Sequence, residues 1–382
     1  MIFKRFMLAA QPLCGIFAIT LVATLSGCAL FSGPVKPKPA ELQPVNGALS
    51  ARQAWSARVN SVGFPLEVHV SGSTISLASS DGTVASIDAR TGRDVWRLSV
   101  GPIAAGVGSD GNIAAVVTQA NEVVAIQNGR ELWRQKLDAQ AYTSPLVAGG
   151  RVFVLAANRS VSAFDGPTGR KLWTQQRPNE PLVLRQSGVI LAVGDTLVVG
   201  LAGRLVGLNP LNGTVRWEAP IASPRGINDV ERLVDLVGPV NRDGDIVCAR
   251  AFQASLGCVN TARGSLLWTK SANGFHGIAG DENLLFGTES DGTVVAWLRN
   301  TGERAWASEL LRYRNLTAPL VIGRAVAVGD FAGFLHLLSR ENGTLLNRLP
   351  TDGSAIAAAP VLVGNTLVAV TRNGAVYGFV PE

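Results

Sequence analysis

The chain holds 382 residues, of which 34 are Lys or Arg and 28 are Asp or Glu, so its formal net charge is +6. The basic residues are scattered singly, which excludes the clustered footprint of a nucleic-acid-binding protein. The three histidines are too far apart for a metal-binding motif, and no phosphate loop or nucleophile elbow occurs. The length suggests two or more domains, although closed repeat architectures reach it as a single unit.

The first residues have the three-part layout of a secretory signal. Lys4 and Arg5 form a short basic start, and residues 6–25 are apolar and uncharged. Small residues then precede a cysteine in Leu25–Cys28, which resembles a bacterial lipobox. The alternative is an uncleaved transmembrane anchor, because the apolar stretch is nearly long enough to span a bilayer.

We therefore expect residues 1–27 to be removed and Cys28 to be lipidated. Ala29, and not Asp, follows the cysteine, which by resemblance to the sorting rule implies anchoring at the periplasmic face of the outer membrane. Residues 28–50 are rich in Pro and Lys, and Pro lacks the backbone donor that sheets and helices need. They are predicted to form a semi-extended tether, followed by one globular domain over residues 51–382.

An internal repeat is the strongest signal in the sequence. The segment Asp88–Trp96 recurs as Asp165–Trp173 and as Asn209–Trp217, each with Gly four residues before the Trp. Three further copies keep that spacing: Gly129 to Trp133, Gly264 to Trp268 and Gly302 to Trp306. A seventh copy keeps Gly343 and has Asn347 in place of the Trp.

Alternating apolar strands precede each copy, as in Thr74–Ala78 and Thr83–Asp88 on either side of an Asp-Gly hairpin signal. Units of three or four short strands with a period near 40 residues are typical of a β-propeller. A sandwich or a β-solenoid explains the repeat less well. Each Trp is expected to fill the gap between neighbouring blades rather than to bind a ligand.

The ends of the chain predict how the ring closes. After the seventh copy, the segment 358–380 supplies three more strands but no Trp strand, and Gln53–Val59 is a Trp strand with no blade before it. We therefore predict an all-β, eight-bladed propeller of four antiparallel strands per blade, with the last blade completed by the N-terminal strand.

The repeat resembles that of quinoprotein dehydrogenases, which depend on the cofactor pyrroloquinoline quinone and are also eight-bladed. An enzyme of that class is therefore the alternative function. The domain is shorter than those enzymes, their adjacent-cysteine pair is absent, and no acidic cluster favours a calcium site. We accordingly expect no enzymatic activity, no cofactor and no metal, with His276 as the one histidine in a Gly-rich connector.

The lipobox, the tether and eight repeats with few insertions together resemble the BamB family, propeller lipoproteins of the outer-membrane β-barrel assembly machinery. This resemblance covers the whole mature chain and implies a scaffold that binds the periplasmic domains of the barrel-forming subunit BamA. Whether unfolded outer-membrane proteins are a second partner stays open.

Two connectors carry the family's contact motifs. Pro181–Arg185 resembles its Leu-x-Leu-Arg segment, and Glu231–Asp235 resembles a second segment in which the family has Asp-x-Asp. The resemblance therefore implies a partner-binding patch of Leu182, Leu184, Arg185 and Asp235. The second Asp is replaced here by Val237.

Cys248 and Cys258 are the cysteines that remain beside Cys28 in the mature chain. They lie at similar distances from a predicted turn at Phe252–Ser255, where opposite residues of two strands come close enough for a disulfide. A cross-strand disulfide and two free buried thiols both fit the sequence.

Overall fold

The computed structural model describes residues 37–45, 47, 49–177, 183–223 and 233–382. The predicted signal, Cys28 and Leu182 lie outside these residues. Residues 39–382 form one compact unit, separate from residues 1–38. The described part of the chain contains strands and turns, and in it no helix is long and apolar enough to cross a membrane.

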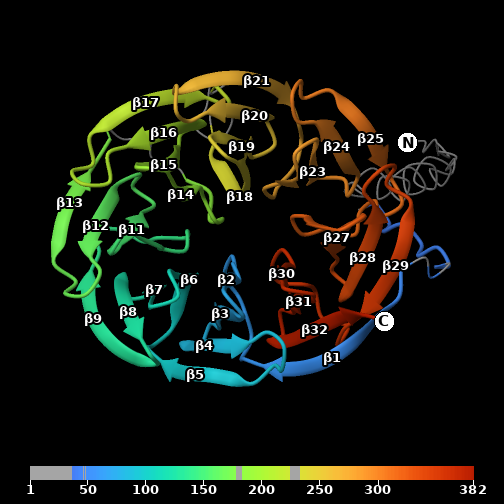
Figure 1. Ribbon diagram of the computed structural model, residues 1–382, viewed down its shortest axis with the longest axis horizontal. Coiled ribbons are helices and arrows are strands. Elements are labelled where there is room, and N and C mark those ends of the chain that lie inside the picture. The colour runs from blue at the N-terminus through green and yellow to red at the C-terminus, as the bar shows by residue number, and fades with distance from the viewer. Residues whose placement is uncertain (1–36, 46, 48, 178–182, 224–232) are drawn as a thin grey trace, which may run out of the picture. The chain divides into compact units, whose positions relative to one another are not determined.

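Eight antiparallel sheets of four strands each, here called blades 1 to 8, form a ring (Figure 1). Blades 1 to 4 consist of β2 (His69–Ser71), β3 (Thr74–Ala78), β4 (Thr83–Asp88) and β5 (Asp94–Ser99); β6 (Ile103–Ser109), β7 (Ile113–Thr118), β8 (Glu122–Gln127) and β9 (Arg130–Lys136); β10 (Leu146–Ala148), β11 (Arg151–Leu155), β12 (Val161–Asp165) and β13 (Lys171–Gln175); and β14 (Ile190–Val193), β15 (Thr196–Leu201), β16 (Arg204–Leu208) and β17 (Val215–Pro220). Blades 5 to 8 consist of β18 (Leu236–Asp243), β19 (Ile246–Ala251), β20 (Ser255–Asn260) and β21 (Ser265–Ser271); β22 (Ala279–Gly280), β23 (Leu284–Thr288), β24 (Val294–Leu298) and β25 (Arg304–Ser308); β26 (Leu320–Ile322), β27 (Ala325–Gly329), β28 (Phe334–Ser339) and β29 (Leu345–Pro350); and β30 (Val361–Val363), β31 (Thr366–Val370), β32 (Ala375–Pro381) and β1 (Ala51–Arg58). The predicted all-β, eight-bladed propeller is confirmed.

The ring closes as the sequence predicts. β1 pairs antiparallel with β32, so the N-terminal strand is the outer strand of blade 8 (Figure 1). Trp55 lies opposite Gly378 in this pairing and is 8% exposed. Both ends of the domain therefore belong to one sheet.

The tryptophans lie between blades, each against the glycine turn of the next blade. The Trp55 indole donates to the Ala89 carbonyl oxygen at 2.9 Å, and a Cβ on Gly92 would lie 2.6 Å from its ring. Gly92 also has a φ of +72°, which disfavours a side chain. The same packing joins Trp96 to Gly129, Trp133 to Gly169, Trp173 to Gly213, Trp217 to Gly264, Trp268 to Gly302 and Trp306 to Gly343.

The junction between blades 7 and 8 is built differently. Asn347 occupies the Trp position of β29, and its amide donates to the Leu49 carbonyl oxygen. Part of the predicted tether continues this contact. Arg348 donates to the Gln43 carbonyl oxygen at 2.9 Å, and Arg314 donates to that of Ala40 at 3.1 Å. Ala40, Gln43 and Leu49 thus bond to blade 7 and to the connector before it.

The hairpin acids have structural roles in the turns. Asp81 accepts hydrogen bonds from the Thr83 amide and the Ser79 hydroxyl. Asp110, Asp291 and Asp330 each accept a bond from the amide two residues further on. These contacts are those of Asx turns.

Cys248 and Cys258 lie directly opposite each other on β19 and β20. The structure joins them in a disulfide, with their Cα atoms 4.0 Å apart. Both residues are fully buried, and they pack in an apolar cluster with Leu256, Leu285 and Trp297. Of the two alternatives, the cross-strand disulfide is the one present.

Candidate functional site

The segments that link the outer strand of one blade to the inner strand of the next lie on one face of the ring, here called the connector face. Within every blade consecutive strands are antiparallel, so each such segment returns the chain to the same side. The glycine turns before the Trp strands lie on the opposite side for the same reason. Leu184 and Arg185 belong to the connector between β13 and β14, and Asp235 ends the connector between β17 and β18.

The structure brings these two connectors together. Asp235 accepts a hydrogen bond from the Leu184 backbone amide at 2.9 Å. Its other oxygen forms an ion pair with Arg159 at 3.0 Å, and both side chains are largely buried. Asp235 therefore holds the Leu184 connector in place and has part of its bonding capacity occupied within the protein.

Arg185 and Leu184 are placed differently from Asp235. Arg185 is exposed, and its guanidinium lies 5.9 Å from the ring of Tyr142, which belongs to the preceding connector. Leu184 is half-buried beside a hollow of about 50 Å³ that Tyr142, Arg159 and Asp235 also line. The fourth predicted residue, Leu182, lies outside the described residues, and Val237 is buried at 1% exposure.

Sequence reasoning missed the residues that support this patch. Arg159 lies in the tight turn between β11 and β12 with a φ of 60°, and Tyr142 lies in a connector without any periodic pattern. The sequence near Arg159 and Tyr142 shows no pattern that marks them as site residues, because their partners, Asp235 and Arg185, are far away in the sequence. Only contact geometry reveals them.

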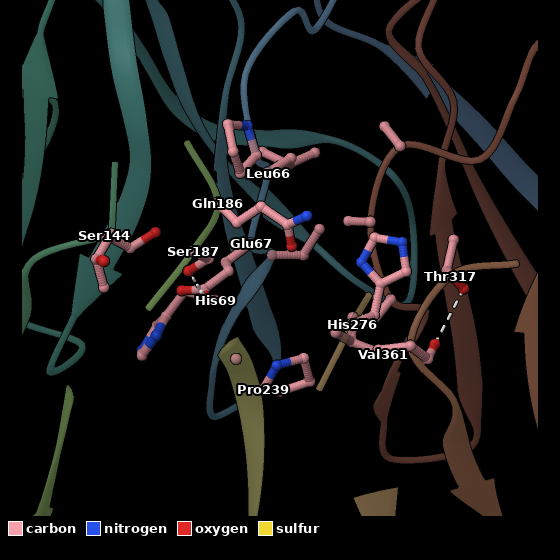
Figure 2. Close-up of a pocket in the computed structure, with 18 of the residues that line it drawn as sticks. Leu66, Glu67, His69, Ser144, Gln186, Ser187, Pro239, His276, Thr317 and Val361 are labelled. Carbon is pink, nitrogen blue, oxygen red and sulfur yellow. Dashed lines mark hydrogen bonds between the residues drawn. The ribbon is translucent and has the colours of Figure 1, made fainter. Parts of the chain in front are cut away.

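A cavity of about 910 Å³ occupies the centre of the ring, where the inner strands of all eight blades meet it. Its wall is mostly apolar, and Arg185 lines it, so the candidate patch borders the cavity. Figure 2 shows Glu67 and Ser187 joined by a hydrogen bond on one side and His276 on the other.

The ionisable groups of the cavity have shifted pKa values. Burial raises the pKa of the Glu67 carboxyl, which accepts a hydrogen bond from the Ser187 hydroxyl. Burial, together with the charges of Arg250 and Arg372, lowers the pKa of His276 to about 4. Burial also lowers the pKa of His69. Both histidines are therefore neutral near pH 7.

The third histidine lies apart from the cavity. His336 is fully buried in blade 7, where its Nε2 lies 2.9 Å from the Asp330 carboxylate, and Arg314 donates to the same oxygen at 2.7 Å. This group has a packing role. In the part of the chain that the structure describes, no three His, Cys, Asp or Glu residues converge as a metal site would require.

The comparisons with known proteins give one family. The model of the family described as outer membrane protein assembly factor BamB matches residues 80–308. The protein of that name from Burkholderia pseudomallei is 38% identical over 90% of this chain and 92% of its own length. The one from Bordetella pertussis is 36% identical over 94% of this chain and 95% of its own length.

Solved structures agree on the fold. BamB from Moraxella catarrhalis has a TM-score of 0.79 at 24% identity, covering 87% of this chain and all of its own. Quinohemoprotein alcohol dehydrogenase from Comamonas testosteroni has a TM-score of 0.68 at 14% identity, covering 87% of this chain and 77% of its own. These two structural similarities show the fold alone, whereas the matches in sequence show the family. The chain belongs to the family of the outer membrane protein assembly factor BamB.

Proposed function

We propose that this protein is a non-enzymatic scaffold of the outer-membrane β-barrel assembly complex. In this proposal a lipid on Cys28 anchors it to the periplasmic face of the outer membrane, and the propeller binds the periplasmic domains of the BamA-type barrel subunit. Family membership supports the assembly role, because the curated relatives carry that name. The lipobox ending in Cys28 supports the anchor.

The contact between Leu184 and Asp235 is the observation that carries the choice of surface. It joins two connectors that are 51 residues apart in the sequence, and both match the family's contact segments. An isolated connector would present its side chains in many conformations, which costs binding free energy when they become ordered. Two connectors fixed to each other present one surface.

Each proposed contact residue has a distinct role. Arg185 is exposed beside Tyr142 and offers a planar cation that suits a carboxylate or backbone carbonyl of the partner. Leu184, together with Leu182, supplies the apolar contact. Asp235 contributes mainly by fixing Leu184, because its carboxylate already bonds to Arg159 and to the Leu184 amide.

Charge reversal at Arg185 tests the proposal. Arg185→Glu should weaken binding to the purified periplasmic domains of the barrel subunit by at least about tenfold, as expected for a central interface arginine. Its melting curve should match the wild type, because the side chain is exposed. Arg130→Glu is the matched control, since Arg130 is an exposed arginine at the start of β9 on blade 2.

The outcomes separate clearly. Equal binding by Arg185→Glu, Leu184→Asp and wild-type protein, all folded, would place the interface elsewhere on the ring. An equal loss for Arg130→Glu and Arg185→Glu would indicate a general effect of charge and would also reject the proposed patch.

A further inference from the structure

Glu67 bonds to a connector that is distant from it in the sequence. It belongs to the segment between β1 and β2, which leads into blade 1, yet its carboxylate accepts a hydrogen bond from Ser187, 120 residues away. Ser187 lies in the connector that leads into blade 4, two residues after Arg185. Figure 2 shows this bond in the central cavity.

Two glycines lie against Glu67 at positions where a side chain would come too close to it. A Cβ on Gly106 would lie 3.2 Å from the Glu67 backbone nitrogen, and one on Gly238 would lie 3.3 Å from its carboxylate oxygen Oε1. Both distances are tighter than ordinary contacts. The segment around Glu67 therefore packs closely against blades 2 and 5 at positions where a side chain is absent.

Ser187 and the residue after it connect this carboxyl to β18 and to the connector before blade 3. Its carbonyl oxygen accepts a bond from the Gly238 amide at 2.9 Å, and the next amide, that of Gly188, donates to the Thr143 hydroxyl at 2.9 Å. Gly238 follows Asp235 by three residues. Glu67 thus bonds to the residue through which the connector of Leu184 and Arg185 meets β18, three residues after Asp235.

The position of the Glu67 carboxyl carries a desolvation free energy that opposes folding. Glu67 is half-buried and lines the cavity, where its carboxyl loses part of its hydration, and among the described residues no cation pairs with it. An apolar side chain would fill this space without that penalty. Its hydrogen bond to Ser187, and its interaction with the Ser144 hydroxyl in the connector before blade 3, are contacts that an apolar residue could not make.

We infer that Glu67 is a positioning residue for the partner-binding patch: by its hydrogen bond to Ser187, it fixes the connector that presents Leu184 and Arg185. This inference rests on the proposed function, because the patch is the surface proposed there. Glu67 itself is not a contact residue for the partner.

Two single variants and their double variant test the bond. In the full mature protein, Glu67→Ala and Ser187→Ala should each increase hydrogen exchange at two amides: that of Gly188, which follows Ser187, and that of Gly238, which donates to the Ser187 carbonyl oxygen. Each should also weaken binding to the barrel subunit's periplasmic domains by about tenfold, as expected for a lost hydrogen bond to an acid. The double variant should bind no more weakly than either single variant, because both remove one interaction.

Two further variants distinguish positioning from general packing. Glu67→Gln retains a group that can bond to the Ser187 hydroxyl, so its affinity and amide exchange should be close to those of the wild type. His276→Ala removes a side chain of the same cavity that makes no hydrogen bond to the described residues of the connector, and it should leave both readouts unchanged. An equal loss in His276→Ala would overturn the inference.

The exchange measurement keeps the inference separate from the proposed function. If Glu67→Ala and Ser187→Ala leave the Gly188 and Gly238 amides as protected as in the wild type, Glu67 does not hold the connector and the inference fails. If the wild-type protein does not bind the barrel subunit at all, the proposed function fails, whatever the exchange shows. If Arg185→Glu loses binding and Glu67→Ala does not, the patch stands and the inference is wrong.

Discussion

Replacement of Trp55 by Ala tests how the ring is closed. The indole is 8% exposed, packs against the Gly92 turn of blade 1 and donates to the Ala89 carbonyl oxygen. Truncation of a buried Trp costs about 3–5 kcal/mol. For a domain of roughly 330 residues, the unfolding entropy is about 0.7 kcal/mol/K, so about 4 kcal/mol corresponds to a fall of about 6 °C in the melting temperature.

A double-mutant cycle with Gly92 isolates the contact. Gly92→Ala should destabilise the protein because the new Cβ would lie 2.6 Å from the Trp55 ring and because φ is +72°. In the Trp55→Ala background the steric part should disappear, so the two effects should not add. Val95→Ala in β5 is the control, since Val95 is 58% exposed. Calorimetric melting of Trp55→Ala within about 1 °C of the wild type would refute this account of the closure.

Three other predictions follow from the described residues. In unreduced protein, mass spectrometry should find Cys248 and Cys258 bridged and unalkylated, and two alkylated thiols would contradict the bridge. Replacing both cysteines with Ser should lower the free energy of unfolding by about 3 kcal/mol, as expected for a disulfide that closes a loop of this length. Purified protein that is mixed with pyrroloquinoline quinone and calcium should bind neither of them stoichiometrically, and it should oxidise no alcohol or sugar. Dye reduction that depends on calcium would reject the scaffold role. The lowered pKa of His276 means that the unfolded chain binds more protons than the folded one between about pH 6.5 and about pH 4, so the free energy of unfolding falls as the pH falls through this window. His276→Gln should remove about 2 kcal/mol of the loss that denaturant titrations measure between about pH 7 and about pH 5. An unchanged loss would exclude His276 as its source.

The blades could be predicted from the sequence because the same local pattern recurs in successive copies of the repeat. The glycine turn and the Trp occur at a fixed spacing of four residues, and their partners lie in the adjacent copy. Even the closure was predictable, since the strand missing at one end is present at the other as β1. Information of this kind is local and repeated, which makes it visible in a single sequence.

The contacts that position the candidate site are not of this kind. Glu67 and Ser187 are 120 residues apart and both lie in connectors without hydrophobic periodicity. Arg159, which pairs with Asp235, lies in a hairpin turn that looks like any other. The family resemblance pointed to Asp235 as a partner contact, but it gave no indication that the carboxylate already bonds to two groups within the protein.

The copy of the repeat without a Trp lies next to blade 8, the blade that closes the ring. A Trp in β29 would need the glycine turn of blade 8 to pack against, but the outer strand of blade 8 is β1, and no hairpin turn joins it to β32 because these two strands lie at opposite ends of the domain. Without that glycine, the space beside β29 is filled by the approaching N-terminal segment, in which Leu49 packs against the apolar cluster of blades 7 and 8. Asn347 is small enough to leave room for this segment and still donates to a backbone oxygen, that of Leu49, as the indoles do at other junctions. The Trp is therefore absent at the junction where the outer strand of the next blade does not follow a glycine turn from its neighbouring strand.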